Sequence, residues 1–353
     1  MDHRVPVRER IVAVLLTGGL AMFLYSGCQS PDESAGEKFA NDRDRNPAKE
    51  DGDKKERKGV QFAEDRALPD VKPIPFDGKR AMQYLTQLCD LGPRLSASPA
   101  MRKQQELLKV HFEKLGATVT LQKFEGTQPS QKGPIPMANM IITWNPDAKR
   151  RVLFAGHYDT RPIADQELRE RDWYKPFISA NDGTSTVAFM MELAHHMKDL
   201  PRNIGLDFII FDGEEYIFDK MRDKFFLGSD YFAKQYAKEK RNHDYIAGVL
   251  LDLFAGKNAQ FPIEVNSRFL AGPVLESVWM EAERQGVKSF IWKQGPEVQD
   301  DHLALNRVRI PTINIIDFEY AHWHKLTDLP ENCSGDTMVD VAKVLTAWVQ
   351  RLK

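Results

Sequence analysis

Apolar positions along the chain follow two spacings, one typical of helices and one typical of strands. An apolar residue at every third or fourth position predicts helices over residues 81–89, 100–115, 187–197, 270–285 and 338–352. Short apolar or alternating runs predict strands over residues 118–124, 138–144, 152–155, 206–211, 246–253 and 312–316. Strands that alternate with helices favour a mostly parallel central sheet with helices on both faces, so we expect an α/β fold, a three-layer αβα sandwich.

The N-terminal region has the order of an export signal. Three arginines precede an apolar stretch over residues 11–25, which is short for a membrane span, and small residues then lead to Cys28. This order is similar to a bacterial lipoprotein signal, although Tyr25 stands where an aliphatic residue is typical. We therefore expect residues 1–28 to be a signal peptide with a lipidated Cys28. A cleaved signal and an uncleaved anchor are the alternatives, and all three place the domain on the periplasmic side of the cell envelope.

The remaining chain divides by composition into a linker and one folded domain. Residues 29–70 are polar and dense in charges of both signs, which favours a disordered linker. Residues 71–353 hold all the expected helices and strands, and we expect them to form a single catalytic domain. The sequence favours a monomer.

Composition excludes some classes of protein. Hydrophobic residues make up 42% of the 353 residues and charged residues 28%, as in a folded core with a polar surface. The formal charge of −2 and the absence of a basic stripe argue against a nucleic-acid partner. Beyond Cys28 only Cys89 and Cys333 occur, and we interpret them as two separate thiols.

Polar residues with catalytic chemistry follow the predicted strands. Those at a strand end or in the loop beyond it are His157, Asp159, Asp212, Glu214, Glu215, Asp252 and His324, and Asp182 lies in a loop ahead of a predicted helix. Taken singly, each has an ordinary explanation as a surface or turn residue. The carboxyl ends of parallel strands meet at one edge of a sheet, so together they predict one shared cleft.

A cluster of buried carboxylates requires a compensating charge. Burying several acids is costly unless a cation or protons balance them. Carboxylate and imidazole ligands without a nearby cysteine suit a catalytic zinc site that keeps one position open, although manganese and cobalt also bind such ligands.

The ordered series of motifs resembles the zinc aminopeptidases of peptidase family M28, from about residue 76 to the C-terminus. Three further features resemble the glutaminyl cyclase branch of that superfamily. Asp300 stands where the peptidases typically have a serine, Trp323 directly precedes His324, and Asp252 lies in the run 250–253. The resemblance implies a zinc-aminopeptidase-like fold.

Two positions depart from the cyclase pattern. Lys220 stands where cyclases carry a tryptophan, so we expect that wall of the substrate pocket to be either missing or supplied by another residue, with Tyr216 and Phe218 as the candidates. Gly156 stands where the first cysteine of a disulfide is expected, so that disulfide is absent.

The resemblance also implies roles for individual residues. Asp182, Glu215 and His324 would hold one zinc ion and leave its fourth position open. Glu214 would be the general acid–base for cyclisation of an N-terminal glutamine on a peptide or protein. Asp252 and Asp300 would form a carboxyl pair that shares a proton and supports catalysis. The side chain of Trp323 would be a substrate-binding wall.

Other assignments remain open at this stage. His157 and Asp252 would bind a second metal in a di-zinc aminopeptidase that removes N-terminal residues, which is the alternative activity. A binding lipoprotein with an inactive site is a third hypothesis. We expect Asp159 to orient His157 or Asp182, and we expect the paired histidines His195 and His196 on an exposed helix surface.

Overall fold

The computed structural model describes residues 71–200 and 204–352. The predicted signal peptide with Cys28 and the predicted linker over residues 29–70 lie outside the described residues. None of the helices in the described residues combines the length and the apolar character that a membrane span requires. Cys89 and Cys333 are buried free thiols, which confirms their interpretation as unpaired.

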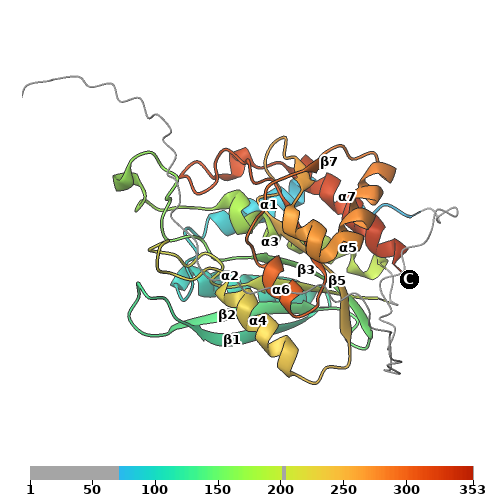
Figure 1. The fold of residues 1–353 in the computed structure, drawn as a ribbon, viewed down its shortest axis with the longest axis horizontal. Helices are drawn as coiled ribbons and strands as arrows, with labels where there is room; N and C mark the ends of the chain where they lie inside the picture. The colour runs from blue at the N-terminus through green and yellow to red at the C-terminus, as the bar shows by residue number, and fades with distance from the viewer. Residues whose placement is uncertain (1–70, 201–203, 353) are drawn as a thin grey trace, which may run out of the picture. The chain divides into compact units, whose positions relative to one another are not determined.

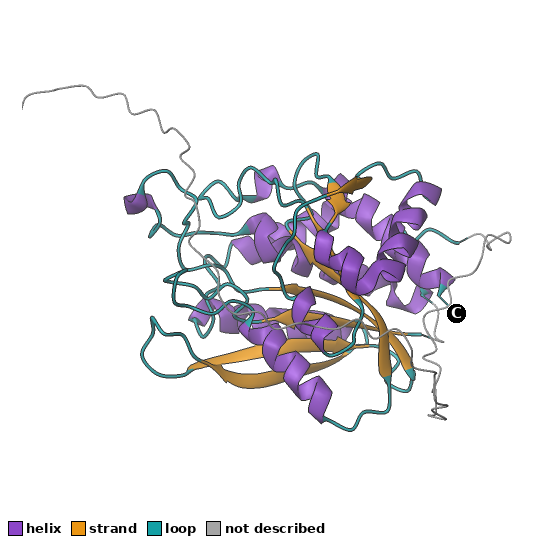
Figure 2. Ribbon diagram, in the orientation of Figure 1, coloured by secondary structure: helices purple, strands orange, loops and turns teal. Residues whose placement is uncertain are grey.

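A six-stranded sheet forms the centre of the fold, in the order β1-β2-β4-β3-β5-β8. Its strands are β1 (Thr118–Gly126), β2 (Ile135–Thr143), β3 (Arg150–His157), β4 (Gly205–Phe211), β5 (Asp244–Asp252) and β8 (Thr312–Ile316). The four strands β4, β3, β5 and β8 run parallel, whereas β1 and β2 are antiparallel to their neighbours. A separate parallel pair, β6 (Phe261–Ile263) and β7 (Phe290–Gln294), is set apart from this sheet in Figure 2.

Successive side chains of β3 enter two different hydrophobic cores, because a strand directs alternate side chains to opposite faces. Val152 and Phe154 pack in the larger core, and Leu153 and Ala155 pack in the smaller one. Five helices supply residues to the larger core: α1 (Gly78–Cys89), α2 (Pro99–Lys114), α3 (Ser185–Leu193), α5 (Val265–Arg284) and α7 (Gly335–Arg351). The helices α4 (Leu227–Lys238) and α6 (His302–Arg307) contact each other on the side of the smaller core (Figure 1). The predicted α/β sandwich with a mostly parallel sheet is therefore confirmed.

Local signals set the first helix boundaries. The Asp77 side chain accepts hydrogen bonds from the backbone N–H groups of Lys79 and Arg80 at the start of α1. Ser98 caps α2 in the same way, and Pro99 occupies its first turn, where no N–H is needed.

All eleven predicted elements are present, but one predicted helix is divided. The expected helix over residues 187–197 continues only to Leu193 as α3, and a 3-10 turn, Ala194–Asp199, follows it. The expectation that both paired histidines lie on the surface is wrong for His196. It is buried, and its Nε2 lies 3.2 Å from an oxygen of the fully buried Glu192, because the tighter turn directs its ring inward.

The elements that the sequence did not predict are short or irregular at their start. Helix α6 has six residues and strand β6 has three, too few to establish a period. Helix α4 begins after Phe226, which has the left-handed φ of 63° and offers no side-chain cap.

Candidate metal centre and substrate cavity

The carboxyl ends of the parallel strands bring the predicted site residues to one edge of the sheet. His157 and Asp252 are the last residues of β3 and β5, and Glu214 and Glu215 follow β4 closely. His324 lies in the loop after β8. The structure therefore brings together residues that are far apart in the sequence.

Asp182, Glu215 and His324 form a buried cluster that could hold a metal ion. One ligand atom from each lies within 4.8 Å of the others. His324 Nε2 is 3.2 Å from Glu215 Oε2 and 3.5 Å from Asp182 Oδ2. Within the described part of the chain, Asp182 Oδ2 is buried and has no hydrogen-bond partner. A buried carboxylate oxygen without a donor is costly, so the donor set fits a bound cation.

A turn before α3 presents Asp182 to this cluster. Ser179 has a left-handed φ of 56°, and Gly183 has a φ of 74°. A Cβ atom on Gly183 would lie 2.6 Å from the His157 ring, so glycine is required there for the close approach. Asp328 fixes the turn from the other side, because its carboxylate accepts the backbone N–H groups of Asn181 and Asp182.

An unpredicted carboxylate orients His324. Asp165 Oδ1 is 2.9 Å from His324 Nδ1, so Nδ1 carries the proton and Nε2 faces the cluster. Arg161 Nη2 donates to the other oxygen of Asp165 at 3.1 Å. Burial opposes ionisation of Asp165, but the bond to His324 and the Arg161 charge lower its pKa to about 2. The sequence signal for this pair is weak, namely an arginine and an aspartate four residues apart just after the His157 motif.

Asp159 holds the two consecutive glutamates. Its carboxylate oxygens accept the backbone N–H groups of Glu214 at 3.1 Å and Glu215 at 3.2 Å. Asp159 Oδ1 lies 3.7 Å from His157 Nδ1, too far for a hydrogen bond, and that nitrogen is instead 3.2 Å from the main-chain carbonyl oxygen of Asp159. Its main contacts, with the glutamate backbone, were not predicted.

His157 lies between the cluster and Asp252. Its Nε2 is 3.1 Å from Asp182 Oδ1 and 3.5 Å from Asp252 Oδ1, and these three side chains form a second group that could hold a metal. Burial disfavours the charged ring, but the negative charge of Glu214 and the bonds to the aspartates raise the pKa of His157 well above its usual range.

The candidate acid–base groups line one cavity, with Asp300 buried and Glu214 half-buried. Burial raises the pKa of Glu214 well above its usual range, and the negative charges of Glu215, Asp301 and Asp300 act in the same direction. Burial also raises the pKa of Asp300 to about 7, and the charge of Asp252 adds to the shift. A carboxyl group with a pKa of about 7, such as that of Asp300, exchanges protons near neutral pH.

A cavity of about 240 Å³ opens onto these groups. The described residues that line it are Arg161, Asp182, Glu214, Glu215, Phe225, Asp252, Glu297, Val298, Gln299, Asp300, Ile316, Phe318, Trp323 and His324. Trp323 is part of an aromatic wall, with its ring centroid 4.2 Å from that of His324 and 5.0 Å from that of Phe318.

The expected replacement for the missing tryptophan is wrong. Tyr216, Phe218 and Lys220 are not among the described residues that line the cavity, whereas Phe225 is. In the loop after β4, the rings of Tyr216 and Phe218 instead pack against each other in an edge contact. The same loop then returns with Phe225.

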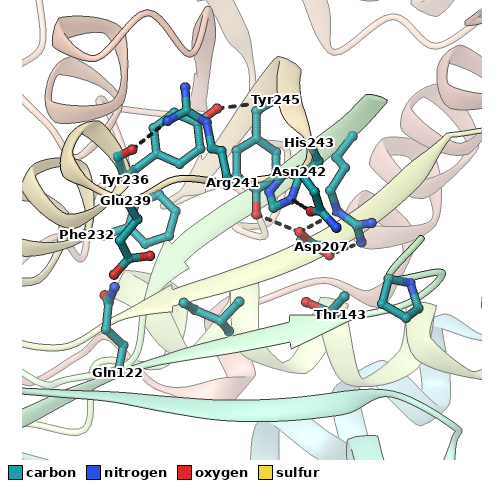
Figure 3. A pocket seen from close by; sticks show the side chains of 13 residues that line it. Gln122, Thr143, Asp207, Phe232, Tyr236, Glu239, Arg241, Asn242, His243 and Tyr245 are labelled. Atoms are coloured by element: carbon teal, nitrogen blue, oxygen red, sulfur yellow. Dashed lines mark hydrogen bonds and ion pairs between the residues drawn. The ribbon is translucent and has the colours of Figure 1, made fainter. Parts of the chain in front are cut away.

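A second cavity, of about 280 Å³, lies near the amino ends of the same strands (Figure 3). Its buried charges satisfy each other: Arg151 Nε donates to Asp207 at 2.8 Å, and the Tyr245 hydroxyl donates to the same oxygen at 2.6 Å. Paired groups of this kind are typical of a structural network. The orphaned Asp182 oxygen distinguishes the cavity at the carboxyl ends as the candidate active site.

Comparisons with known proteins agree with this geometry. The sequence pattern of peptidase family M28 matches residues 139–349. The crystal structure of Fimbriiglobus ruber glutaminyl cyclase is 49% identical and superposes with a TM-score of 0.79, covering 81% of this chain and 98% of that chain. A leucine aminopeptidase precursor from Bacteroides thetaiotaomicron is 29% identical, with a TM-score of 0.76 and coverage of 80% and 100%. The glutaminyl-peptide cyclotransferase of Boiga dendrophila is 27% identical over 288 residues, covering 72% of this chain and 76% of that protein. The shared fold, the matched length and the carboxylate–histidine cluster lead to one conclusion: the chain belongs to peptidase family M28, in its glutaminyl cyclase branch.

Proposed function

We propose that this protein is a zinc-dependent glutaminyl-peptide cyclotransferase, which converts the N-terminal glutamine of a peptide to pyroglutamate and releases ammonia. The observation that carries the proposal is the cavity itself. It places the cluster of Asp182, Glu215 and His324 beside the two acids Glu214 and Asp300. The relatives named glutaminyl cyclase support the same activity.

Asp182, Glu215 and His324 would hold the metal. Three protein ligands leave a position for a substrate oxygen, and a bound zinc ion would supply Lewis-acid polarisation of the glutamine side-chain carbonyl. We propose one zinc ion. A second ion would need Asp252 as a ligand, but Asp252 lines the cavity with Asp300 and its charge raises the pKa of Asp300, so Asp252 would serve that carboxyl pair instead.

Glu214 would act as the acid–base. It removes a proton from the substrate α-amine, whose nitrogen then forms a bond to the side-chain carbonyl carbon. The bond from that carbon to the amide nitrogen breaks, and Glu214 returns the proton so that the nitrogen leaves as ammonia. Glu214 lines the same cavity as the proposed metal ligands, so its carboxyl group is placed for both transfers. Because the nucleophile belongs to the substrate, positioning supplies much of the rate.

Asp252 and Asp300 would stabilise the leaving amide nitrogen by hydrogen bonds. The charge of Asp252 raises the pKa of Asp300, so one of the two would retain a proton and offer both a donor and an acceptor. Asn314 Nδ2 donates to Asp300 Oδ2 at 2.7 Å and fixes that carboxylate. Trp323 and Ile316 provide the apolar wall for the glutamine methylenes.

Mass spectrometry of a glutamine-initiated peptide tests the proposal directly. Incubation with zinc-loaded protein should release ammonia while every peptide bond stays intact. Release of free glutamine would contradict cyclisation.

A di-zinc aminopeptidase is the second candidate, favoured by one observation. His157, Asp182 and Asp252 form a group with ligand atoms within 4.8 Å, next to the first cluster. Two metal ions per chain together with cleavage of the first peptide bond would establish it. One ion together with ammonia release would exclude it.

We also propose export and lipid anchoring at Cys28, on the strength of the N-terminal sequence alone. Replacement of Cys28 by serine should move the protein from the membrane fraction to the soluble fraction of the producing cell. Retention in the membrane would favour an uncleaved anchor.

A further inference from the structure

Arg161 is a buried cation at the wall of the candidate active site. It lies in the loop after β3, and its side chain is 2% exposed. Its Nη2 donates to Asp165 at 3.1 Å, and its Nη1 is 3.8 Å from Glu215 Oε2, too far for a hydrogen bond. The Phe225 ring covers the guanidinium, with the Arg161 Cζ atom 5.4 Å from the ring centroid.

Two donors of this guanidinium are unused. Among the described residues, neither Nη1 nor Nε of Arg161 has a hydrogen-bond partner, although both atoms are buried. Buried donors are nearly always paired, and an unpaired one costs stability. Arg161 and Phe225 both line the cavity of about 240 Å³, so an acceptor bound there would reach the buried free donors after a small shift of the Phe225 ring.

The chemistry of an N-terminal glutamine residue limits what that acceptor is. The residue has three polar groups: the α-amine, the side-chain amide and the main-chain carbonyl. The proposed function assigns the amine to Glu214 and the amide to the metal and to Asp252 and Asp300. Only the main-chain carbonyl oxygen is left, and it is an acceptor without a partner.

We propose that Arg161 is a substrate-binding residue whose unpaired guanidinium N–H donates to the carbonyl oxygen of the first peptide bond. This inference rests on the proposed function and deepens it. The contact would select peptides over molecules that carry only the reacting amine and amide. Phe225 would hold the guanidinium in place and shield the bond from water.

A peptide isostere tests the contact. Two substrates are compared, a glutamine-initiated peptide and its neutral analogue in which a trans carbon–carbon double bond replaces the first peptide bond. In the wild-type protein, kcat/KM should be about 10- to 100-fold lower for the analogue, as expected for a hydrogen bond from a charged donor. In Arg161→Met, kcat/KM for the peptide should fall by a similar factor, and the variant should show no preference between the two substrates. Arg161→Lys should keep an intermediate preference.

Equilibrium binding and metal content separate this role from a purely structural one. A peptide that begins with pyroglutamate keeps the same carbonyl, so its affinity should fall in Arg161→Met while that of its alkene counterpart should not. The inference would be overturned if Arg161→Met lowered kcat/KM or affinity equally for the peptide and for its alkene analogue. It would also be overturned if loss of bound metal accounted for the whole effect.

Failure of the variant to fold and failure of the proposed function lead to different results. If Arg161→Met does not fold, the wild-type comparison still decides, because equal kcat/KM values for peptide and alkene contradict the contact. If the wild-type protein releases no ammonia, the proposed function fails, and the pyroglutamyl pair still tests Arg161 by binding.

Discussion

At the scale of single residues, the site depends on acids that fix other side chains. Asp165 sets the tautomer of His324, Asp159 holds the backbone of the two glutamates, and Asp328 holds the turn before Asp182. Each contact joins a loop to a different loop. Such partners decide how accurately ligands are placed and how tightly a metal binds.

Replacement of Asp165 by asparagine should weaken metal binding. The amide no longer supplies a charged acceptor for His324 Nδ1, so the ring loses its fixed orientation. We expect zinc affinity to fall by roughly 10- to 100-fold, measured by competition with a chelator. Asp172→Asn is the matched control in the same segment, because Asp172 pairs with Arg169 and Lys175 instead of a cluster residue. Equal affinity in the two variants would refute the role of Asp165.

Replacement of Glu214 by glutamine should remove turnover while metal stays bound. Glu214 is outside the cluster of Asp182, Glu215 and His324, so the amide leaves the proposed ligands in place. We expect kcat to fall by roughly 10²- to 10⁴-fold, the usual contribution of an acid–base. Glu319→Gln, an exposed acid in the loop of His324, is the control. Turnover near the wild-type rate in Glu214→Gln would exclude the assignment.

At the scale of elements, the packing of α3 on β3 positions the site. Gly156 is the penultimate residue of β3, and a Cβ there would overlap the Thr186 methyl group and lie 3.0 Å from the Leu251 carbonyl oxygen. Thr186 Oγ1 donates to that same carbonyl. The absence of a side chain at Gly156 therefore lets α3 approach the sheet, with Asp182 in the turn before it. The glycine that stands where a cysteine was expected is a packing requirement in this chain.

Replacement of Gly156 by alanine should destabilise the protein by about 1–3 kcal/mol, the usual cost of overpacking a core. Thr186→Ser removes the overlapping methyl group and keeps the hydroxyl. The double variant should therefore recover part of the loss, which denaturant midpoints would measure. If the changes in unfolding free energy of the two single variants simply added in the double variant, the contact between positions 156 and 186 would not limit the packing.

At the scale of the whole molecule, buried acids make stability depend on pH and on metal. Burial is the main cause that raises the pKa of Asp212, Glu215, Asp300 and Asp328 to about 7 each. The folded protein therefore holds more protons than the unfolded chain between about pH 4 and 7. In that window, stability must fall as the pH rises, unless a cation compensates the carboxylates.

The metal-free protein should therefore have a lower Tm at pH 8 than at pH 5, and zinc should reduce the difference. His324 also makes the folded protein less stable as the pH rises. Burial opposes its charge, but the bonds to Asp165 and Glu215 raise its pKa to about 9, so its contribution is present below about pH 6.5 and lost as the pH rises through 9. Thermal scans of chelated and zinc-loaded protein would measure this. A Tm of the chelated protein that rises from pH 5 to pH 8 would contradict it.

The sequence by itself determined the type and order of the main elements and the edge of the sheet where the chemistry lies. Hydrophobic periodicity is a local property, so runs such as residues 206–211 and 312–316 were assigned with nearly the observed bounds. The acids and histidines that follow those runs had to meet, because parallel strands end at one edge.

Only the tertiary structure decided which loop residues complete the site. Asp165 and His324 are 159 positions apart, and Phe225 takes the place expected for Tyr216 or Phe218. These residues lie in irregular loops, where no period fixes the direction of a side chain. Their positions follow from how each loop closes against the others, and that depends on contacts between segments distant in the sequence.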